Sequence, residues 1–329
     1  MHLHILKIFF LTMVLFSVQV PLFAQDEPQF TQYMLNPLQF NPAAAGNEQA
    51  IVTTLDARNQ WVGIPGAPQT QSLTSHMPIY KISSGIGLSI LNDVAGQQTT
   101  TGATFSYAYR KQFKESSLSF GIYGGVVQRT LDGSKLRAPD GSYQDGNVDH
   151  NDDHIPVTLE SSVIPDAGAG IWFKGENLYF GASGEHLLNN YFSFNTSVNT
   201  STIQYNPAGY VTVGYKISIG DNFGVTPSVL YKTDLTESMV DVNTIIDYKD
   251  NIFVASSLRS YLNEQTDAVA LIGGWNISKK LGISYSYDIT LSSLKTVSAG
   301  SHEIVLRYKI FVEKPRAGKE INNLRYLYY

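Results

Sequence analysis

The chain contains no cysteine among its 329 residues. This absence excludes a disulfide framework, a thiol nucleophile, a cysteine-ligated zinc site and an amino-terminal cysteine lipid anchor. Basic residues are also in the minority, because 23 Lys and Arg stand against 28 Asp and Glu, giving a formal net charge of −5. Without a basic excess to neutralise phosphates, binding to nucleic acid is not expected.

Charge of either sign is scarce. Charged residues make up 16% of the chain, compared with about 25% in ordinary soluble domains. Hydrophobic residues make up 43%, and the chain holds 20 Tyr, 16 Phe, 3 Trp and 27 Gly. This composition indicates a surface that does not face water everywhere.

Long apolar runs are missing beyond the first 24 residues. Residues 1–24 combine a weakly basic start, the apolar run Ile8–Val20 and a small residue, Ala24, at the expected cleavage point, which is typical of a secretory signal peptide. As an anchor helix, the run would be short for a hydrocarbon layer of about 30 Å. No later segment approaches 18 consecutive apolar residues. A soluble exported protein or a membrane β-barrel remains.

Helical periodicity is also hard to find, whereas apolar and polar residues alternate along most of the mature chain. In residues 281–290, for example, Leu, Ile, Tyr, Tyr and Ile alternate with Gly, Ser, Ser, Asp and Thr. Such runs predict about fourteen strands, many of them as long as the 9–11 residues with which a tilted strand crosses a bilayer. The expected strands are 50–60, 69–80, 84–93, 99–111, 116–130, 166–174, 177–187, 207–219, 223–232, 238–248, 251–261, 266–278, 281–290 and 301–312.

The polar face of these strands distinguishes a membrane barrel from a soluble sandwich. It is mostly Gly, Ser, Thr and Asn with isolated charges, which suits a crowded, wet barrel interior, while the apolar face meets lipid. Lipid also demands closure of the sheet. We therefore predict an all-β, closed antiparallel transmembrane β-barrel of about 14 strands over residues 50–312. Aromatic residues near strand ends are expected to form interface girdles: Tyr80, Tyr109, Phe113, Phe223, Tyr231, Tyr248 and Tyr261.

The connections between the expected strands alternate in length. The short ones are 81–83, 112–115, 175–176, 220–222, 249–250 and 279–280, and the long ones are 61–68, 94–98, 131–165, 188–206, 233–237, 262–265 and 291–300. Outer-membrane barrels have short periplasmic turns and longer external loops. This predicts an integral outer-membrane protein with both termini in the periplasm.

Two flanking segments depart from the barrel pattern. Residues 25–49 are rich in Gln, Asn, Pro and Ala, and we expect them to form a plug or hatch at the periplasmic mouth. Residues 313–329 form a basic and aromatic tail, expected in the periplasm. The tail either contacts a periplasmic partner or is a frayed terminus.

Acidic residues in the longest loop are the only candidates for a metal site. Asp149, Asn151, Asp153 and Glu160 match positions 1, 3, 5 and 12 of a calcium loop, but His154 occupies the position that needs Gly. Whether this loop binds calcium stays open, and a solvated acidic loop is the favoured interpretation. His150 and His154 lie four residues apart in a sequence unsuited to a helix, which disfavours zinc. We predict no metal site and no cofactor.

Catalytic motifs are missing as well. The sequence has no G-x-S-x-G elbow, Walker loop or H-E-x-x-H. His186 and His302 lie near strand ends, and a hydrolase would need a Ser or Asp beside one of them. Gly85 and Gly87 fall inside a strand, where we expect them to relieve crowding. We predict no catalytic or cofactor-binding residues and no enzyme activity.

Several motifs together resemble the PorP/SprF family of type IX secretion outer-membrane proteins. They are Gln29–Gly46 (QFTQYMLNPLQFNPAAAG), Gln60–Gly63 with Gly66–Thr70, Gly85–Asp93, Ala108–Arg110 with Leu118–Gly121, and Ser301–Ile304. The resemblance implies a fourteen-stranded, non-catalytic barrel that supports secretion or surface attachment of particular cargo proteins, such as adhesins, or links the outer membrane to the periplasmic machinery. It implies three partners: the carboxy-terminal domain of a secreted cargo, periplasmic secretion components and outer-membrane lipid.

A cargo would meet the external loops 131–165 and 188–206. We expect edge pairing there, with aromatic contacts from Tyr143, Tyr191, Phe192 and Phe194. The alternative is an outer-membrane channel for a hydrophobic small molecule. The hatch motif Asn41-Pro42-Ala43 is similar to that of long-chain fatty-acid channels. The polar inward faces suit a greasy ligand poorly.

Overall fold

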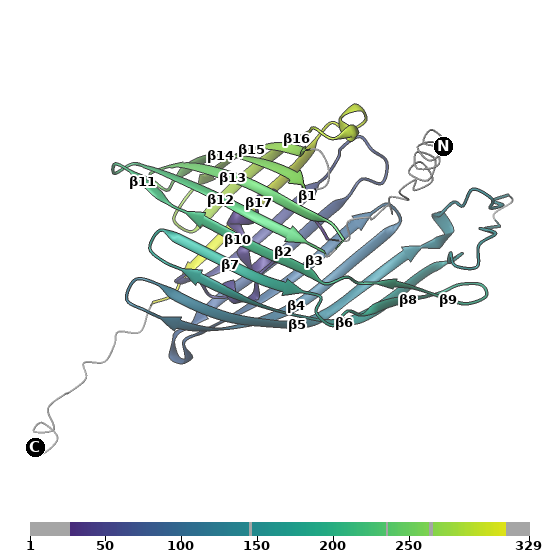
Figure 1. Ribbon diagram of the computed structural model, residues 1–329, viewed down its shortest axis with the longest axis horizontal. Coiled ribbons are helices and arrows are strands. Elements are labelled where there is room, and N and C mark those ends of the chain that lie inside the picture. Colours follow the sequence, from purple (N-terminus) through teal and green to yellow (C-terminus); the bar gives the residue numbers. More distant parts are fainter. Residues whose placement is uncertain (1–26, 145–146, 235, 263–265, 314–329) are drawn as a thin grey trace, which may run out of the picture.

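In a computed structural model the chain forms a closed antiparallel β-barrel (Figure 1). The structure describes residues 27–144, 147–234, 236–262 and 266–313. Fifteen strands form one sheet, and the sheet closes because β10 pairs with both β7 and β12. The short β11 continues β10 after Lys216, so the wall contains fourteen strands, as predicted. The strands of the wall are β1 Ala50–Asn59, β2 Gln69–Ile79, β3 Ser84–Ala95, β4 Gln98–Gln112, β5 Ser117–Asp132, β6 Leu159–Lys174, β7 Leu178–Glu185, β10 Ala208–Tyr215, β11 Ile217–Ile219, β12 Phe223–Thr233, β13 Ser238–Tyr248, β14 Ile252–Tyr261, β15 Thr266–Asn276, β16 Leu281–Thr290 and β17 Ser301–Phe311.

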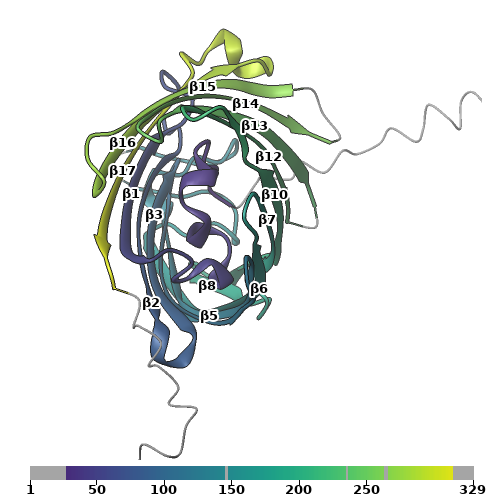
Figure 2. The ribbon, with the colours of Figure 1, turned by 90° about the vertical axis from the view of Figure 1, so that its left-hand side faces the viewer.

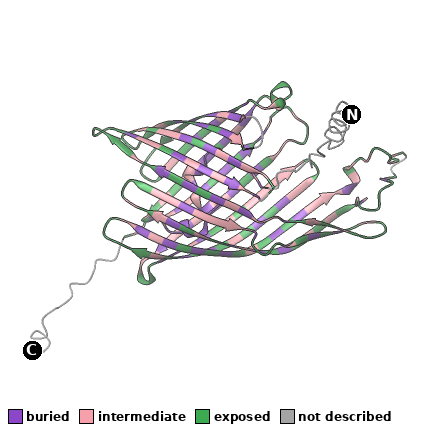
Figure 3. Ribbon diagram, in the orientation of Figure 1, coloured by how far each residue is buried: buried purple, intermediate pink, exposed green. Residues whose placement is uncertain are grey.

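The alternation in sequence becomes an alternation in burial (Figure 3). On β5, Phe120, Ile122 and Val126 point outward and are 53%, 62% and 51% exposed, whereas Tyr123 and Val127, at alternate positions, are buried. The same striping runs around the wall, because successive side chains of a strand point to opposite faces. An outer face of this kind offers apolar side chains to lipid, and the polar face lines the lumen.

Three loop predictions need correction. The segment 94–98 is no loop, because β3 and β4 leave only a two-residue turn at Gly96 and Gln97. The loop 131–165 is shorter than expected, since β5 runs to Asp132 and β6 begins at Leu159. The loop 188–206 contains a hairpin of its own, formed by β8 Tyr191–Asn195 and β9 Thr200–Gln204.

Tyr261, a member of the expected aromatic girdle, faces the wrong way for that role. Tyr109, Phe113, Phe223 and Tyr248 are outward and 42–50% exposed near the short turns. Tyr261, however, lies on the inward face of β14 and hydrogen-bonds to Gln29 inside the barrel. Alternation from Arg259, which is buried, fixes this orientation.

The barrel interior holds the segment that precedes β1 (Figure 2). Residues 27–49, called the lumenal segment here, contain three single-turn 3₁₀ helices, η1 Tyr33–Leu35, η2 Pro37–Gln39 and η3 Pro42–Ala44. Asn41 caps the last of them by accepting a hydrogen bond from the backbone N–H of Ala43 at 2.9 Å. Such short turns satisfy only part of the backbone, so the remaining polar groups need partners on the barrel wall.

Within the described residues, no helix has the length and apolar character needed to cross a membrane. The expected signal peptide, residues 1–24, lies outside the described residues, as do residues 25 and 26 of the expected plug. The expected tail lies outside them too, apart from Glu313.

Candidate functional site

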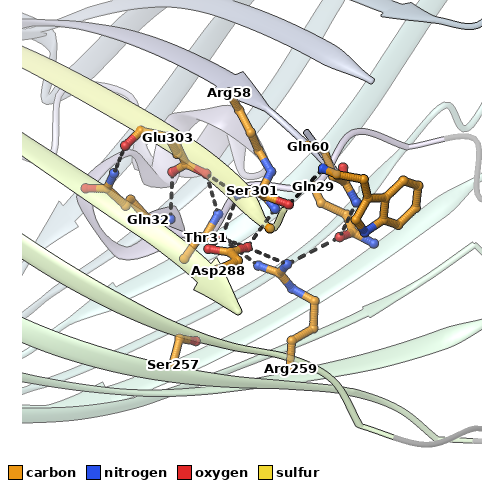
Figure 4. Close-up of polar contacts among 12 residues, drawn as sticks. Gln29, Thr31, Gln32, Arg58, Gln60, Ser257, Arg259, Asp288, Ser301 and Glu303 are labelled. Carbon is orange, nitrogen blue, oxygen red and sulfur yellow. Dashed lines mark hydrogen bonds and ion pairs between the residues drawn. The ribbon is translucent and has the colours of Figure 1, made fainter. Parts of the chain in front are cut away.

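A buried charge network attaches the start of the lumenal segment to the wall (Figure 4). Arg58 on β1 contacts Asp288 on β16 at 2.7 Å and Glu303 on β17 at 3.0 Å. Arg259 on β14 contacts the same Asp288 oxygen at 3.2 Å. These side chains are at most 3% exposed. Ion pairs this buried are weak stabilisers, but losing one partner is costly.

Thr31 is the centre of this charge network. Its hydroxyl donates to Asp288 at 2.7 Å and accepts hydrogen bonds from Arg58 at 2.8 Å and Arg259 at 2.9 Å. The carboxylate of Glu303 accepts the backbone N–H groups of Thr31 and Gln32 at 2.8 and 2.9 Å. The wall thus binds the backbone of the segment as well as its side chains, which fixes the register of residues 31 and 32.

Glycines in the wall allow the other end of the segment to lie directly on the sheet. A Cβ at Gly85 would stand 2.2 Å from the carbonyl oxygen of Ala45, and one at Gly121 would stand 2.3 Å from the nitrogen of Ala43. Gly46 has φ +65°, a conformation that favours glycine. The small residues of the Asn41–Gly46 stretch therefore meet small wall positions, and Gly85 serves this contact specifically.

A second charged cluster lies where β7 ends. His186 follows β7 with φ +56°, a strained conformation for a non-glycine residue. Its Nδ1 pairs with Asp166 at 2.9 Å and its Nε2 with Glu27 at 2.8 Å. Lys232 donates to the backbone carbonyls of Glu27 and Pro28 at 3.1 and 3.2 Å. This cluster holds the beginning of the lumenal segment.

The electrostatics of the cluster favour the charged forms of Glu27 and His186. Burial opposes ionisation of Glu27, but the charge of His186, with Lys232 and Arg129, outweighs it and lowers the pKa of Glu27 to about 2. Burial likewise opposes the imidazolium, but Glu27 and Asp166 outweigh it and raise the pKa of His186 to about 11. The Glu27–His186 pair is therefore ionised at neutral pH.

The same cluster contains potential metal ligands. Glu27, Glu185 and His186 offer ligand atoms within 4.8 Å of one another. Both ring nitrogens of His186 are already paired with carboxylates, Nδ1 with Asp166 at 2.9 Å and Nε2 with Glu27 at 2.8 Å. Ion pairing therefore accounts for the geometry, and no metal chemistry follows from it.

The Glu27–His186 pair should respond to pH in a defined direction. His186 has a raised pKa, so its stabilisation is complete below pH 6.5 and is lost as the pH rises through about 11. Glu27 has a lowered pKa, so its contribution is complete above pH 4.5 and is lost as the pH falls towards 2. We expect Glu27→Gln to lower the pKa of His186 by more than about 1 unit, measured by NMR titration of ring-labelled histidine in nanodiscs. An unchanged titration would contradict the pairing.

The expected calcium ligands do not gather into one group. Asp149 accepts the backbone N–H of Asn151 at 2.9 Å, which is a local turn contact. Asp153 is exposed, and Glu160 lies on β6, where its carboxylate accepts from Asn195 at 3.3 Å. Among the described residues, the acidic loop therefore does not show the ligand cluster that a calcium loop would need.

The expected histidine candidates have structural partners. His150 is 2% exposed; its Nδ1 lies 3.0 Å from the Tyr143 hydroxyl, and its Nε2 lies 3.0 Å from the carbonyls of Gly133 and Pro156. His154 is exposed. His302 lies 2.6 Å from the hydroxyl of Tyr285. His186 does have an Asp partner, but its ring is paired on both nitrogens.

The aromatic residues expected to contact a cargo differ in their exposure to solvent. Phe192 and Phe194 are 0% and 1% exposed. They form a small core with Val127 and Ile164, and Arg129 stacks on Phe192 at 4.4 Å. Tyr191 remains 53% exposed. Phe192 and Phe194 therefore hold the β8–β9 hairpin over the extended ends of β5 and β6, and are no contact surface.

Comparison with known proteins agrees with the motifs. The family model described as "Type IX secretion system membrane protein PorP/SprF" matches residues 22–308. No curated protein sequence matches the chain.

Solved structures are similar to the chain only distantly. A monoaromatic hydrocarbon channel, CymD, is 11% identical with a TM-score of 0.49, covering 87% of this chain and 94% of its own. The toluene transporter TbuX of Ralstonia pickettii is 10% identical with a TM-score of 0.48, covering 86% and 94%. The outer membrane protein Omp33 of Acinetobacter baumannii is 6% identical with a TM-score of 0.45, covering 80% and 99%. We draw nothing about ligands from similarities this distant.

The family match is stronger evidence than these structural similarities, because it includes the lumenal segment and all but the last residues of the barrel. It covers the Thr31 network, the glycine contacts of Asn41–Gly46 and the His186 cluster. This chain therefore belongs to the PorP/SprF family of type IX secretion system membrane proteins and is an integral outer-membrane β-barrel.

Proposed function

We propose that this barrel supports the type IX secretion or surface attachment of specific cargo proteins, without catalysing a reaction. The observation that carries the proposal is the family match over residues 22–308. The attachment of the lumenal segment inside the barrel supports it further. The lumenal segment is bound to the wall at the Thr31 network and again at His186, which suits a scaffold better than an open pore.

In this proposal the short turns face the periplasm and the long connections face outward. Support comes from the lengths of the connections. Links such as 249–251 lie at one end of the barrel, and links such as 133–158 lie at the other. Short periplasmic turns and longer external loops are usual in outer-membrane barrels. The lumenal segment then acts as a plug, and the end of β17 at Phe311 faces the periplasmic secretion components.

A channel for a hydrophobic small molecule is less well supported. A cavity of about 100 Å³ lies beside the lumenal segment. Its lining includes apolar Phe40 and Leu230 but also Glu27, His186 and Lys232. A charged cluster at this position would have to lose water or ion partners whenever a greasy ligand passed.

Deletion of the gene, followed by quantitative proteomics of the cell surface and the culture fluid, tests the proposal. We expect loss of one or a few large type IX cargoes from the surface, with other secretion intact. Loss of every type IX cargo would instead assign the barrel to the core machinery. Unchanged secretion would contradict the proposal and favour the alternative function, a channel for a hydrophobic small molecule such as a lipid. Restoration by the wild-type gene is the control.

A further inference from the structure

The β5–β6 hairpin projects beyond the rest of the wall at the end with the long connections (Figure 1). β5 and β6 remain paired out to Asp132 and Leu159. β7, the other neighbour of β6, pairs only with residues 169–174. The part of β6 from Leu159 to Val163 therefore has a ladder partner on one side only, and its second edge is open.

Hydrogen bonds around β6 show which backbone groups face this open edge. The carbonyl of Ala167 accepts the N–H of Leu187, and the carbonyl of Pro165 accepts the side-chain amide of Asn190 at 2.7 Å. Both bonds lie on the β7 side. Because backbone groups alternate between the two edges of a strand, the N–H and C=O groups of Leu159, Ser161 and Val163 point to that side as well. No other described strand pairs with them.

The β8–β9 hairpin does not close this edge. Its backbone reaches the side chains of Ser162 and Glu160, which belong to the opposite, lumen-facing set of β6. Its buried Phe192 and Phe194 pack on Ile164 of the same set. The hairpin thus covers the face of β6, while the side chains of Leu159 and Val163 stay 64% and 61% exposed.

Acidic residues outnumber basic ones around the edge. The connection 133–158 and the adjoining strand ends carry Asp132, Asp140, Asp149, Asp152, Asp153 and Glu160. Lys135 pairs with Asp132 at 2.7 Å. Arg137 stacks on Tyr143 at 4.4 Å rather than on a carboxylate. Exposed carboxylates such as Asp149 and Asp152 accept only backbone N–H groups of their own turns.

We propose that the open edge of β6 at residues 159–163 is a strand-addition site for the cargo, which pairs there through an extended segment. This inference rests on the function proposed above. The segment would add main-chain hydrogen bonds to Leu159, Ser161 and Val163 and place apolar residues at alternate positions against Leu159 and Val163. Basic residues beside it would face the acidic connection. Pro165, which has no N–H, ends the site towards the membrane.

Proline at Ser161 tests the site, because it removes an edge N–H while leaving the β5 ladder bonds intact. The probe is the cargo whose surface level falls in the deletion strain. We expect Ser161→Pro to lower its surface level at least about tenfold, and Ser161→Ala, the matched control, to leave it unchanged. Heat-modifiable migration shows that each variant forms the barrel.

A photo-crosslink gives a second measurement that does not depend on folding of the proline variant. Benzoylphenylalanine at Val163 should crosslink to that cargo, whereas the same group at Ile246, outward on β13, should not. Equal surface levels in the two Ser161 variants, or crosslinks from Ile246 as strong as those from Val163, would overturn the edge site. The secretion phenotype of the deletion would then still stand. If the deletion strain showed no secretion phenotype, the proposed function itself would be overturned.

Discussion

Replacing Arg58 by Met should lower the free energy of unfolding of the barrel by about 3–5 kcal/mol. Arg58 is 2% exposed and contacts Asp288, Glu303 and the hydroxyl of Thr31. Methionine fills much of the volume but leaves two buried carboxylates short of a partner. Urea titration of the protein refolded in lipid vesicles, followed by tryptophan fluorescence, measures the change.

Lys216→Met provides the matched control for Arg58. The Lys216–Asp250 pair has a similar distance, 2.7 Å, but its side chains are 43% and 79% exposed. Water and salt screen such a pair, so the change should cost no more than about 1 kcal/mol. Neutralising both carboxylates in Arg58→Met, with Asp288→Asn and Glu303→Gln, should recover part of the loss. Equal urea midpoints for Arg58→Met and Lys216→Met would contradict the role of the network.

The fold could be predicted from the sequence because one physical signal repeats along the chain. Alternation at residues 238–248 and 281–290 gives the strands β13 and β16 with the same bounds in the structure. The bounds of the loops are harder to predict, because β5 and β6 continue beyond the length needed to cross the membrane without a change in alternation. The alternation therefore does not show where a strand leaves the lipid. The hairpin of β8 and β9 was missed for a related reason: its five-residue strands resemble an aromatic loop.

The candidate site could be predicted only in outline. Residues 25–49 were expected to form a plug, and the described part of this segment does lie in the lumen, although its position relative to the periplasm stays a prediction. The sequence places Asp288 and Glu303 on the polar faces of their strands. Their convergence with Arg58 and Arg259 depends on register around a closed barrel. Local sequence patterns do not predict pairing between strands far apart in sequence, such as β1 and β17.

Gly121→Ala should release the Asn41–Gly46 stretch of the lumenal segment from the wall. The new Cβ would stand 2.3 Å from the nitrogen and 2.4 Å from the Cα of Ala43. Both are backbone atoms, so rotation of a side chain cannot relieve the clash. Overpacking of this kind costs about 1–3 kcal/mol, and the barrel itself should persist because the β4–β5 and β5–β6 ladders remain.

Access to Ala44 measures this release, because Ala44 is fully buried and the chain has no cysteine of its own. In an Ala44→Cys background we expect Gly121→Ala to raise the rate of maleimide labelling at least about tenfold, since 1.4 kcal/mol changes an equilibrium tenfold. Gly124→Ala is the control, because Gly124 lies on the same strand with nothing within 4 Å of its Cβ position. If both alanine variants label at the same rate, the wall glycines do not hold the segment, and its attachment rests on polar contacts with the wall, such as the Thr31 network and the His186 cluster.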